Sequence, residues 1–183
     1  MSSPLLSAYL DSAYAFLSDF ALSELFWAKF AAVYGTEYDF ATAEALRGRW
    51  ASGDFTGLPT IAVVGGSGLG LARGAYGASN NTIYLSDAFL VSAAPEQVVA
   101  VLLEEVGHYV DALVNGVDTP GDEGDYFARL VLGQPVSEQE VSRLQAEHDG
   151  ATVFVDAEIV AVELSAALTY FLTIDGVNGG ATT

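Results

Sequence analysis

Two adjacent glutamates and a histidine are the residues whose types and spacing suggest chemistry in this sequence. Glu104, Glu105 and His108 occur in the stretch EEVGH, and in a helix Glu104 and His108 share one face, one turn apart. Carboxylates and imidazole are ligands of divalent metals, and a carboxylate beside the metal can act as a general base. The pattern therefore predicts a metal site or a proton-transfer site on a helix.

The segment around these groups predicts that they are buried. Apolar residues point to nearly every side of the helix expected from Pro95 to Val114, which is typical of a buried helix. Buried carboxylates must be paired, protonated or bound to a metal, and the chain has only six basic residues to pair with them. Gly107 lies in the helix interior, where glycine costs about 1 kcal/mol, and so indicates close backbone packing.

A simpler interpretation needs no metal. Glu104 and Glu105 would reach solvent or share protons, and His108 would be a hydrogen-bonded core histidine. That interpretation leaves unexplained why the acidic segment DTPGDEGDYFA follows directly, so a metal or proton-transfer site is favoured. A di-iron carboxylate centre built on Glu105 and His108 would need a second Glu-x-x-His, and the chain has none.

The elements that must position these groups predict an α+β domain. One or two packing helices are expected from Pro4 to about Tyr34, and another from 41 to 50. Short strands are expected at 60–64, 82–86, 151–155 and 158–164. The central helix should end near Gly116 as its C-cap, a shorter helix should begin near Asp122, and a third should run from Ser137, in a capping box, to about His148.

The glycine-rich segment 65–77 invites a nucleotide-binding interpretation that its spacing does not support. After Gly66 and Gly68 the third glycine of the dinucleotide motif should stand at position 71, which is Leu71. No Gly-Lys-Ser/Thr follows either. The segment is therefore expected to be a flexible turn or a hairpin.

Two motifs together resemble the core of the zincin metallopeptidases. The zincin sequence has His-Glu-x-Gly-His on one helix and then an acidic ligand before an aromatic-Ala pair. Similar stretches in this chain are EEVGHYVD on the central helix and GDEGDYFA on the next. Over about residues 50–165 the chain also resembles the N-terminal domain of cyanobacterial and related secreted proteins of the calcium-binding, RTX-associated type. The resemblance implies N-terminal helices, a small mixed or antiparallel sheet, and a central active-site helix followed by shorter helices.

The resemblance to zincins also implies a role for each site residue. Glu104 stands at the first metal-ligand position, Glu105 at the general base and His108 at the second ligand. Glu123 or Asp125 supplies the third ligand, with Glu123 narrowly favoured because its side chain is longer. Asp111 stands at a position that often supports such a site by orienting a ligand or holding the helix in place.

The metal is expected to be a divalent cation, with zinc first and manganese or calcium as alternatives. Glu104 stands where the zincin pattern has histidine, which makes the site more anionic and shifts its preference toward manganese, calcium or iron. It also weakens activation of a metal-bound water. A calcium-stabilised surface domain is a further interpretation, because acids cluster in one loop at Asp118, Asp122, Glu123 and Asp125, although the D-x-D-x-D-G spacing is absent.

Composition limits the partners and the location of the protein. A net charge of −18 disfavours nucleic acid and anionic lipid, and no apolar run is long enough to cross a bilayer. The absence of cysteine excludes disulfides and thiolate metal sites. The N-terminus lacks the features of a cleavable signal peptide, whereas the acidic, lysine-poor composition resembles bacterial proteins exported in one step. Secretion without a signal peptide is therefore expected, with a cytoplasmic location as the alternative.

The last residues, 166–183, have a different sequence pattern from the rest of the chain. Residues 1–165 are expected to form the metal-site domain, and 166–183 a C-terminal strand or linker that leads to a further domain. YFLTIDGVNGGATT resembles the opening strand of hemolysin-coregulated-like proteins of type VI secretion. The leading expectation is a metal-dependent hydrolase domain, acting on peptide or protein substrates, within a larger exported protein. The alternative is an inactive zincin-like module with a structural or interaction role.

Overall fold

A computed structural model describes residues 4–65, 68–117, 119–148, 150–155 and 158–165. The expected C-terminal strand or linker, 166–183, and Asp118 of the acidic loop lie outside these residues. The described part is an α+β fold, as expected, with seven helices and a five-stranded mixed sheet. No helix in these residues combines the length and apolar character that crossing a bilayer requires.

The N-terminal third forms a helical layer. The expected helices are present as α1 (Pro4–Leu22), α2 (Phe26–Tyr34) and α3 (Phe40–Ala51). Asp39 caps α3 by accepting hydrogen bonds from the backbone N–H groups of Ala41 and Thr42. Aromatic rings of α1 and α2, such as Phe20 and Phe26, pack into the main core.

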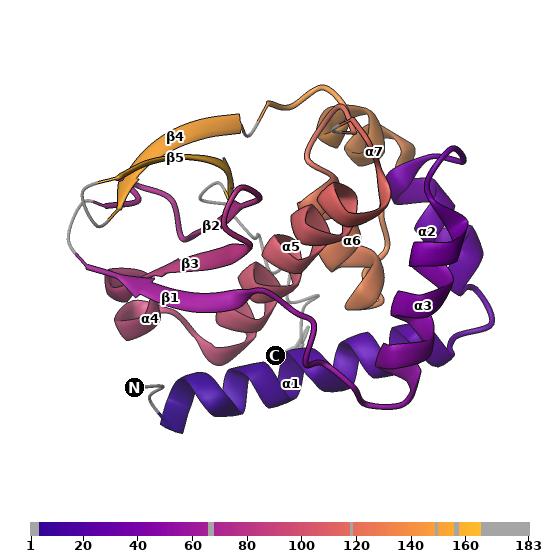
Figure 1. The fold of residues 1–183 in the computed structure, drawn as a ribbon, viewed down its shortest axis with the longest axis horizontal. Coiled ribbons are helices and arrows are strands. Elements are labelled where there is room, and N and C mark those ends of the chain that lie inside the picture. The colour runs from indigo at the N-terminus through magenta and orange to yellow at the C-terminus, as the bar shows by residue number, and fades with distance from the viewer. Residues whose placement is uncertain (1–3, 66–67, 118, 149, 156–157, 166–183) are drawn as a thin grey trace, which may run out of the picture.

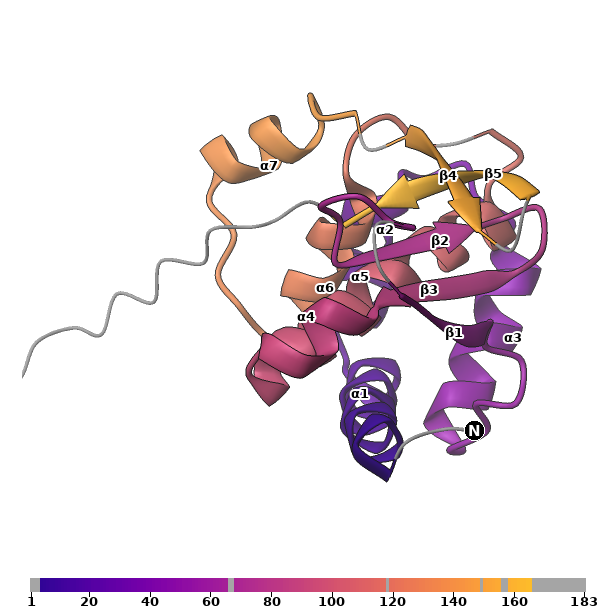
Figure 2. The same cartoon turned by 90° about the vertical axis from the view of Figure 1, so that its left-hand side faces the viewer.

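The sheet has the strand order β1-β3-β2-β5-β4. β1 (Thr60–Val64) and β3 (Thr82–Ser86) pair in parallel, and the other neighbours are antiparallel. β2 (Gly74–Gly77) lies between β3 and β5 (Glu158–Leu164), and β4 (Gly150–Val155) forms the outer edge beside β5. Figure 2 shows β5 and β4 stacked beyond β2, far from β1. The sheet is therefore mixed, and residues distant in sequence meet at β2 and β5.

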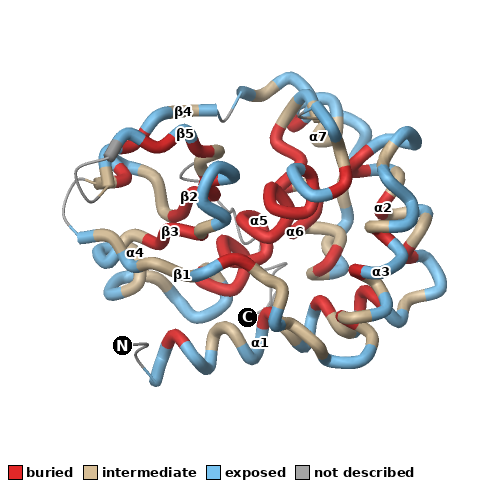
Figure 3. The backbone as a smooth tube through the Cα atoms, viewed as in Figure 1, coloured by how far each residue is buried: buried red, intermediate tan, exposed pale blue. Residues whose placement is uncertain are grey.

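The helix α5 (Pro95–Val114) runs through the middle of the molecule. Figure 1 shows the strands on one side of α5 and α2, α3 and α6 (Glu123–Val131) on the other. Every residue from Val98 to Asp111 is buried, and the tube in Figure 3 is red over this stretch. Pro95 stands in the first turn, where its missing N–H is not needed. The prediction that this helix is buried is confirmed.

Of the turn or hairpin expected in the glycine-rich segment, the hairpin is present, because GAYG is the strand β2 and pairs antiparallel with β3. DAFLVS forms the short helix α4 (Asp87–Ser92), which is capped by Ser86 and was not predicted. The predicted ends of two helices were wrong. The helix that begins at the Ser137 capping box, α7 (Glu138–Leu144), ends about a turn before His148. The C-cap of α5 is Asn115 in an extended conformation, because its N–H and side chain bond to Asp111 and no left-handed glycine is needed.

Candidate metal centre

The helix α5 places its three candidate residues in the interior. Glu104, Glu105 and His108 are 1%, 0% and 0% exposed. They lie where α5 faces both α6 and the β2–β5 part of the sheet. Partners for these groups must therefore come from α6 and from those strands.

The contact between α5 and α6 depends on two glycines. A Cβ atom on Gly107 would lie 2.8 Å from the Cα of Gly124, so the two backbones touch at this point. A Cβ atom on Gly124 would lie 2.4 Å from Nε2 of His108. The close packing expected from Gly107 is confirmed, and the imidazole lies directly over the first turn of α6.

Two carboxylates surround one nitrogen of His108. Nδ1 lies 2.8 Å from Oε1 of Glu123 on α6 and 3.0 Å from Oε2 of Glu163 on β5. Glu123 is one of the two residues expected as third ligand, and it meets His108 through this nitrogen. Glu163 was not predicted from the sequence.

The described residues contain two groups whose side chains could hold a metal ion. One consists of Glu104, His108 and Asp122, and the other of His108, Glu123 and Glu163. In each group the ligand atoms lie within 4.8 Å of one another. Both groups include His108, and neither contains Glu104 together with Glu123. Asp122, expected only as part of a calcium-binding loop, lies next to the predicted ligands Glu104 and His108.

Glu105 faces the sheet. Its Oε1 would be 2.5 Å from a Cβ atom on Gly74, so the glycine at the start of β2 leaves room for the carboxylate. Neither carboxylate oxygen has a hydrogen-bond partner of normal geometry among the described residues. Burial raises the pKa of the Glu105 carboxyl to about 8, although nearby His108 and hydrogen bonding by the Ser165 hydroxyl lower it. The Ser165 hydroxyl oxygen accepts the N–H of Gly74, which fixes its position.

Around Glu104 and His108, ionised carboxylates are unfavourable in the buried interior unless a cation is present. Burial, followed by the nearby Glu105 and Asp122, raises the pKa of the Glu104 carboxyl well above its usual value. Burial lowers the pKa of the His108 imidazole. Its hydrogen bonds to Glu123 and Glu163 raise the pKa by more than burial lowers it, so the pKa lies well above its usual value. In the metal-free protein the protonated forms of both groups are therefore favoured.

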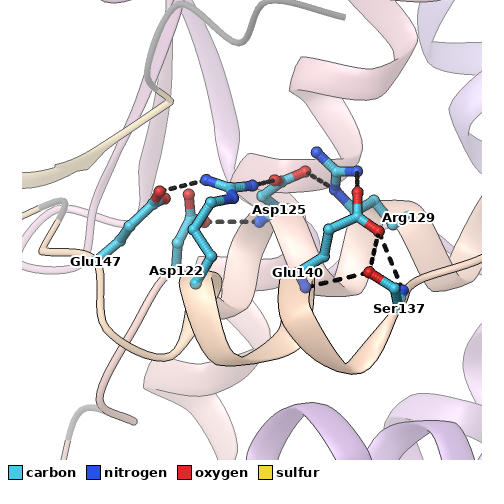
Figure 4. Close-up of polar contacts among 7 residues, drawn as sticks. Asp122, Asp125, Arg129, Ser137, Glu140 and Glu147 are labelled. Carbon is cyan, nitrogen blue, oxygen red and sulfur yellow. Dashed lines mark hydrogen bonds and ion pairs between the residues drawn. The ribbon is translucent and has the colours of Figure 1, made fainter.

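Asp125, the alternative third ligand, is directed elsewhere. Its Oδ1 accepts a hydrogen bond of 2.8 Å from Nε of Arg129, and its Oδ2 lies 3.7 Å from Nη2 of Arg143 (Figure 4). Its backbone N–H donates to Oδ1 of Asp122, which caps α6. Two arginines thus balance this acid, and Asp125 belongs to neither metal-capable group.

Asp111 connects the end of α5 to the loop that follows. Its carboxylate accepts hydrogen bonds from the side chain of Asn115 and from the backbone N–H and hydroxyl of Thr119. The loop leads into Asp122 and Glu123, so Asp111 holds the segment that carries both acids.

Comparison of the chain with models of known protein families, with curated proteins and with solved structures gives no match. Assignment of the site therefore rests on its geometry.

Proposed function

We propose that this chain is a divalent-metal-binding domain with a hydrolase-type site between α5 and α6. The observation that carries the proposal is the buried group of Glu104, His108 and Asp122. Oε1 of Glu104 is buried and has no hydrogen-bond partner among the described residues. Arg129 and Arg143 pair with Asp125. A divalent cation would balance the carboxylates and use oxygen and imidazole ligands that it prefers.

The orientation of His108 fits this role. A histidine that binds a metal through one ring nitrogen usually donates its other N–H to a carboxylate. Here Nδ1 is 2.8 Å from Glu123, and Nε2 faces the first turn of α6, where Asp122 precedes Gly124. In our proposal Nε2 is the metal ligand, Asp122 joins Glu104 and His108, and Glu123 orients the imidazole. Glu123 is thus reassigned from the ligand role predicted from the sequence.

Glu105 is the general base of the proposed hydrolase. Its carboxylate lies beside the ligands on the same helix, on the side that faces β2 and Ser165. A bound divalent cation would supply Lewis acidity and make a water molecule more acidic. Glu105 would hold the proton released by such a water, and a bound cation would lower the pKa of its carboxyl, which burial raises to about 8. We propose a peptide bond as the substrate, from the resemblance to zincins.

A non-catalytic metal-binding module is the second candidate. It is favoured by the complete burial of Glu105, because a base at 0% exposure meets substrate only after the site opens. Closed sites with all ligands from the protein are typical of structural metals. The two candidates share the metal site and differ in whether hydrolysis accompanies it.

Metal content tests the proposal directly. Protein purified without chelators, and apo protein titrated with zinc or manganese, should bind about one ion per chain. Glu104→Gln, Asp122→Asn and His108→Ala should each lower the affinity at least about tenfold, because each removes one of three protein ligands. Glu96→Gln is the matched control, since Glu96 is an exposed glutamate on the same helix.

The variants also separate ligand loss from misfolding. Helical content by circular dichroism should stay unchanged in the isosteric variants. A wild-type protein that binds neither zinc nor manganese, or an Asp122→Asn variant that binds as tightly as wild type, would contradict the proposed ligand set.

A further inference from the structure

A surface cavity of about 380 Å³ opens on the sheet where β2, β5 and β4 lie side by side. Its wall includes Tyr76 on β2, Ala161 and Glu163 on β5, and Thr152 on β4. Tyr76 and Glu163 are directly paired across the two strands. Among the described lining residues Glu163 is the one carboxylate, so the cavity has a single anionic point in its wall.

Glu163 reaches from this cavity to the Nδ1 side of His108, where it belongs to the group of His108, Glu123 and Glu163. Its side chain is 23% exposed, whereas the His108 side chain, 3.0 Å from its Oε2, is fully buried. Tyr76 packs its ring edge-on against Tyr109 of α5, with the ring centroids 6.1 Å apart, which closes the wall beside Glu163. One carboxylate thus separates the cavity from the imidazole.

The described residues offer a narrower alternative route. A cavity of about 30 Å³ lies on the α6 side and is lined in part by Asp122, Glu123 and Gln145. It holds only about two water molecules, which is too small for a cation that keeps several waters of hydration. The larger cavity has no such limit.

We propose that the divalent cation enters and leaves the centre through the sheet cavity, and that Glu163 is the gate. This inference rests on the proposed metal site and adds its route of access. The gate closes when Oε2 of Glu163 contacts Nδ1 of His108, and it opens when the carboxylate turns into the cavity. The cation then passes the group of His108, Glu123 and Glu163 before it reaches Glu104 and Asp122 on the Nε2 side of the ring. A hydrated cation is attracted to this carboxylate, and the net charge of −18 favours its approach.

The route is tested by measuring the rates of metal uptake and release in variants in which a larger side chain blocks one cavity. Zinc uptake by the apo protein and zinc release to excess chelator are followed by stopped-flow with an indicator dye. Ala161→Phe places a ring in the sheet cavity at an exposed position and should slow uptake and release equally, by at least about fivefold, with an unchanged equilibrium constant. Gln145→Phe, at the mouth of the small cavity, is the matched control and should leave both rates as in wild type.

The gate is tested by removing the carboxylate. Glu163→Ala should accelerate both uptake and release of zinc, because it removes the side chain that closes the cavity; loss of its contact with His108 should also weaken binding. Thr152→Phe, opposite Ala161 on β4, repeats the blocking experiment if Ala161→Phe does not fold.

The outcomes separate the two proposals. If wild type binds zinc but both phenylalanine variants in the sheet cavity exchange it at the wild-type rate, the route is wrong and the metal site stands. Slowing by Gln145→Phe alone overturns the route in the same way. Release from Glu163→Ala at the wild-type rate overturns the gate. A wild type that binds no zinc or manganese overturns the proposed function and this inference with it.

Discussion

At the scale of single residues, Glu105 and Glu104 have different surroundings although they are adjacent. Glu104 belongs to the group with His108 and Asp122, whereas Glu105 faces Gly74 and Ser165 on the sheet side. Adjacent helical positions point about 100° apart, so this division follows from helix geometry. Substitutions of the two glutamates should therefore have different effects on metal binding and on hydrolysis.

The first prediction separates these roles. Glu105→Gln should keep metal affinity within about threefold of wild type and abolish peptide hydrolysis, because it removes a base and no ligand. Glu104→Gln should lose both. Metal titration and cleavage of an unfolded protein substrate measure the two properties. Equal loss of metal in both variants would show that the division of roles is wrong.

The second prediction concerns the glutamate that replaces histidine. Glu104→His should raise the ratio of zinc to manganese affinity by at least about tenfold, since imidazole suits zinc better than manganese. Competition titrations with the two metals give a ratio that partial misfolding does not alter. An unchanged or lower ratio would mean that position 104 does not contact the metal.

At the scale of elements, the contact between α5 and α6 is the feature that the site cannot lose. The third prediction is that Gly124→Ala destabilises the protein by about 1–3 kcal/mol and weakens metal binding, because the new methyl group meets the His108 ring. The backbone cannot retreat, since Gly107 already touches Gly124.

Gly48→Ala on α3 is the control for this prediction. Gly48 is also helical, and a Cβ atom there meets nothing within 4 Å, so the change should stabilise by about 0.5–1 kcal/mol. Urea denaturation of the apo proteins measures both effects. Gly124→Ala with the stability and the metal affinity of wild type would contradict the close contact.

The elements that could be predicted from sequence are those with local signals. Strands β1 and β3 have the predicted bounds, and α5, α6 and the Ser137 capping box agree with the prediction to within a few residues. β2 was missed because GAYG, with two glycines and one alanine, has weak strand propensity. Its position between β3 and β5 is fixed by pairing, and pairing with β5 is a contact between segments far apart in sequence.

The site residues divide in the same way. Glu104, Glu105 and His108 were found because one helix sets their spacing, and Glu123 and Asp125 because the next helix follows closely. Glu163 has no local signal, since a glutamate near the end of a strand is usually solvated. It meets His108 because β5 pairs with β2, and sequence spacing does not reveal that order. Asp122 is the N-cap that precedes α6, whereas Asp125 lies within the helix and pairs with Arg129.

At the scale of the whole molecule, several acidic residues of this acidic chain lie in its interior. Glu104, Glu105, Asp122, Glu123 and Asp125 are all buried, whereas the chain has only six basic residues in all. Arg129 and Arg143 pair with Asp125, and His108 contacts Glu123, but burial of this many acids also depends on protons or on metal. The chain's stability should therefore respond to both.

The last prediction concerns the pH dependence of stability without metal. The pKa of Glu105 is raised from 4.5 to about 8, and those of Glu104 and His108 are raised as well. Between pH 4.5 and 8 the folded protein thus binds more protons than the unfolded chain, so its stability falls as the pH rises, by about 1.4 kcal/mol per pH unit for each such proton. Glu105→Gln, which has no proton to lose, should flatten this slope.

Metal should reverse the trend. Because the ligands must lose their protons before they bind, saturating zinc or manganese should raise the melting temperature more at pH 8 than at pH 5.5. Thermal denaturation at both pH values, with chelator and with metal, gives the four melting temperatures needed. Without metal, the melting temperature should be higher at pH 5.5 than at pH 8. With metal, this difference should become smaller or change sign. An apo protein that is more stable at pH 8 would mean that the buried carboxylates are already balanced, and the case for a cation between α5 and α6 would fail.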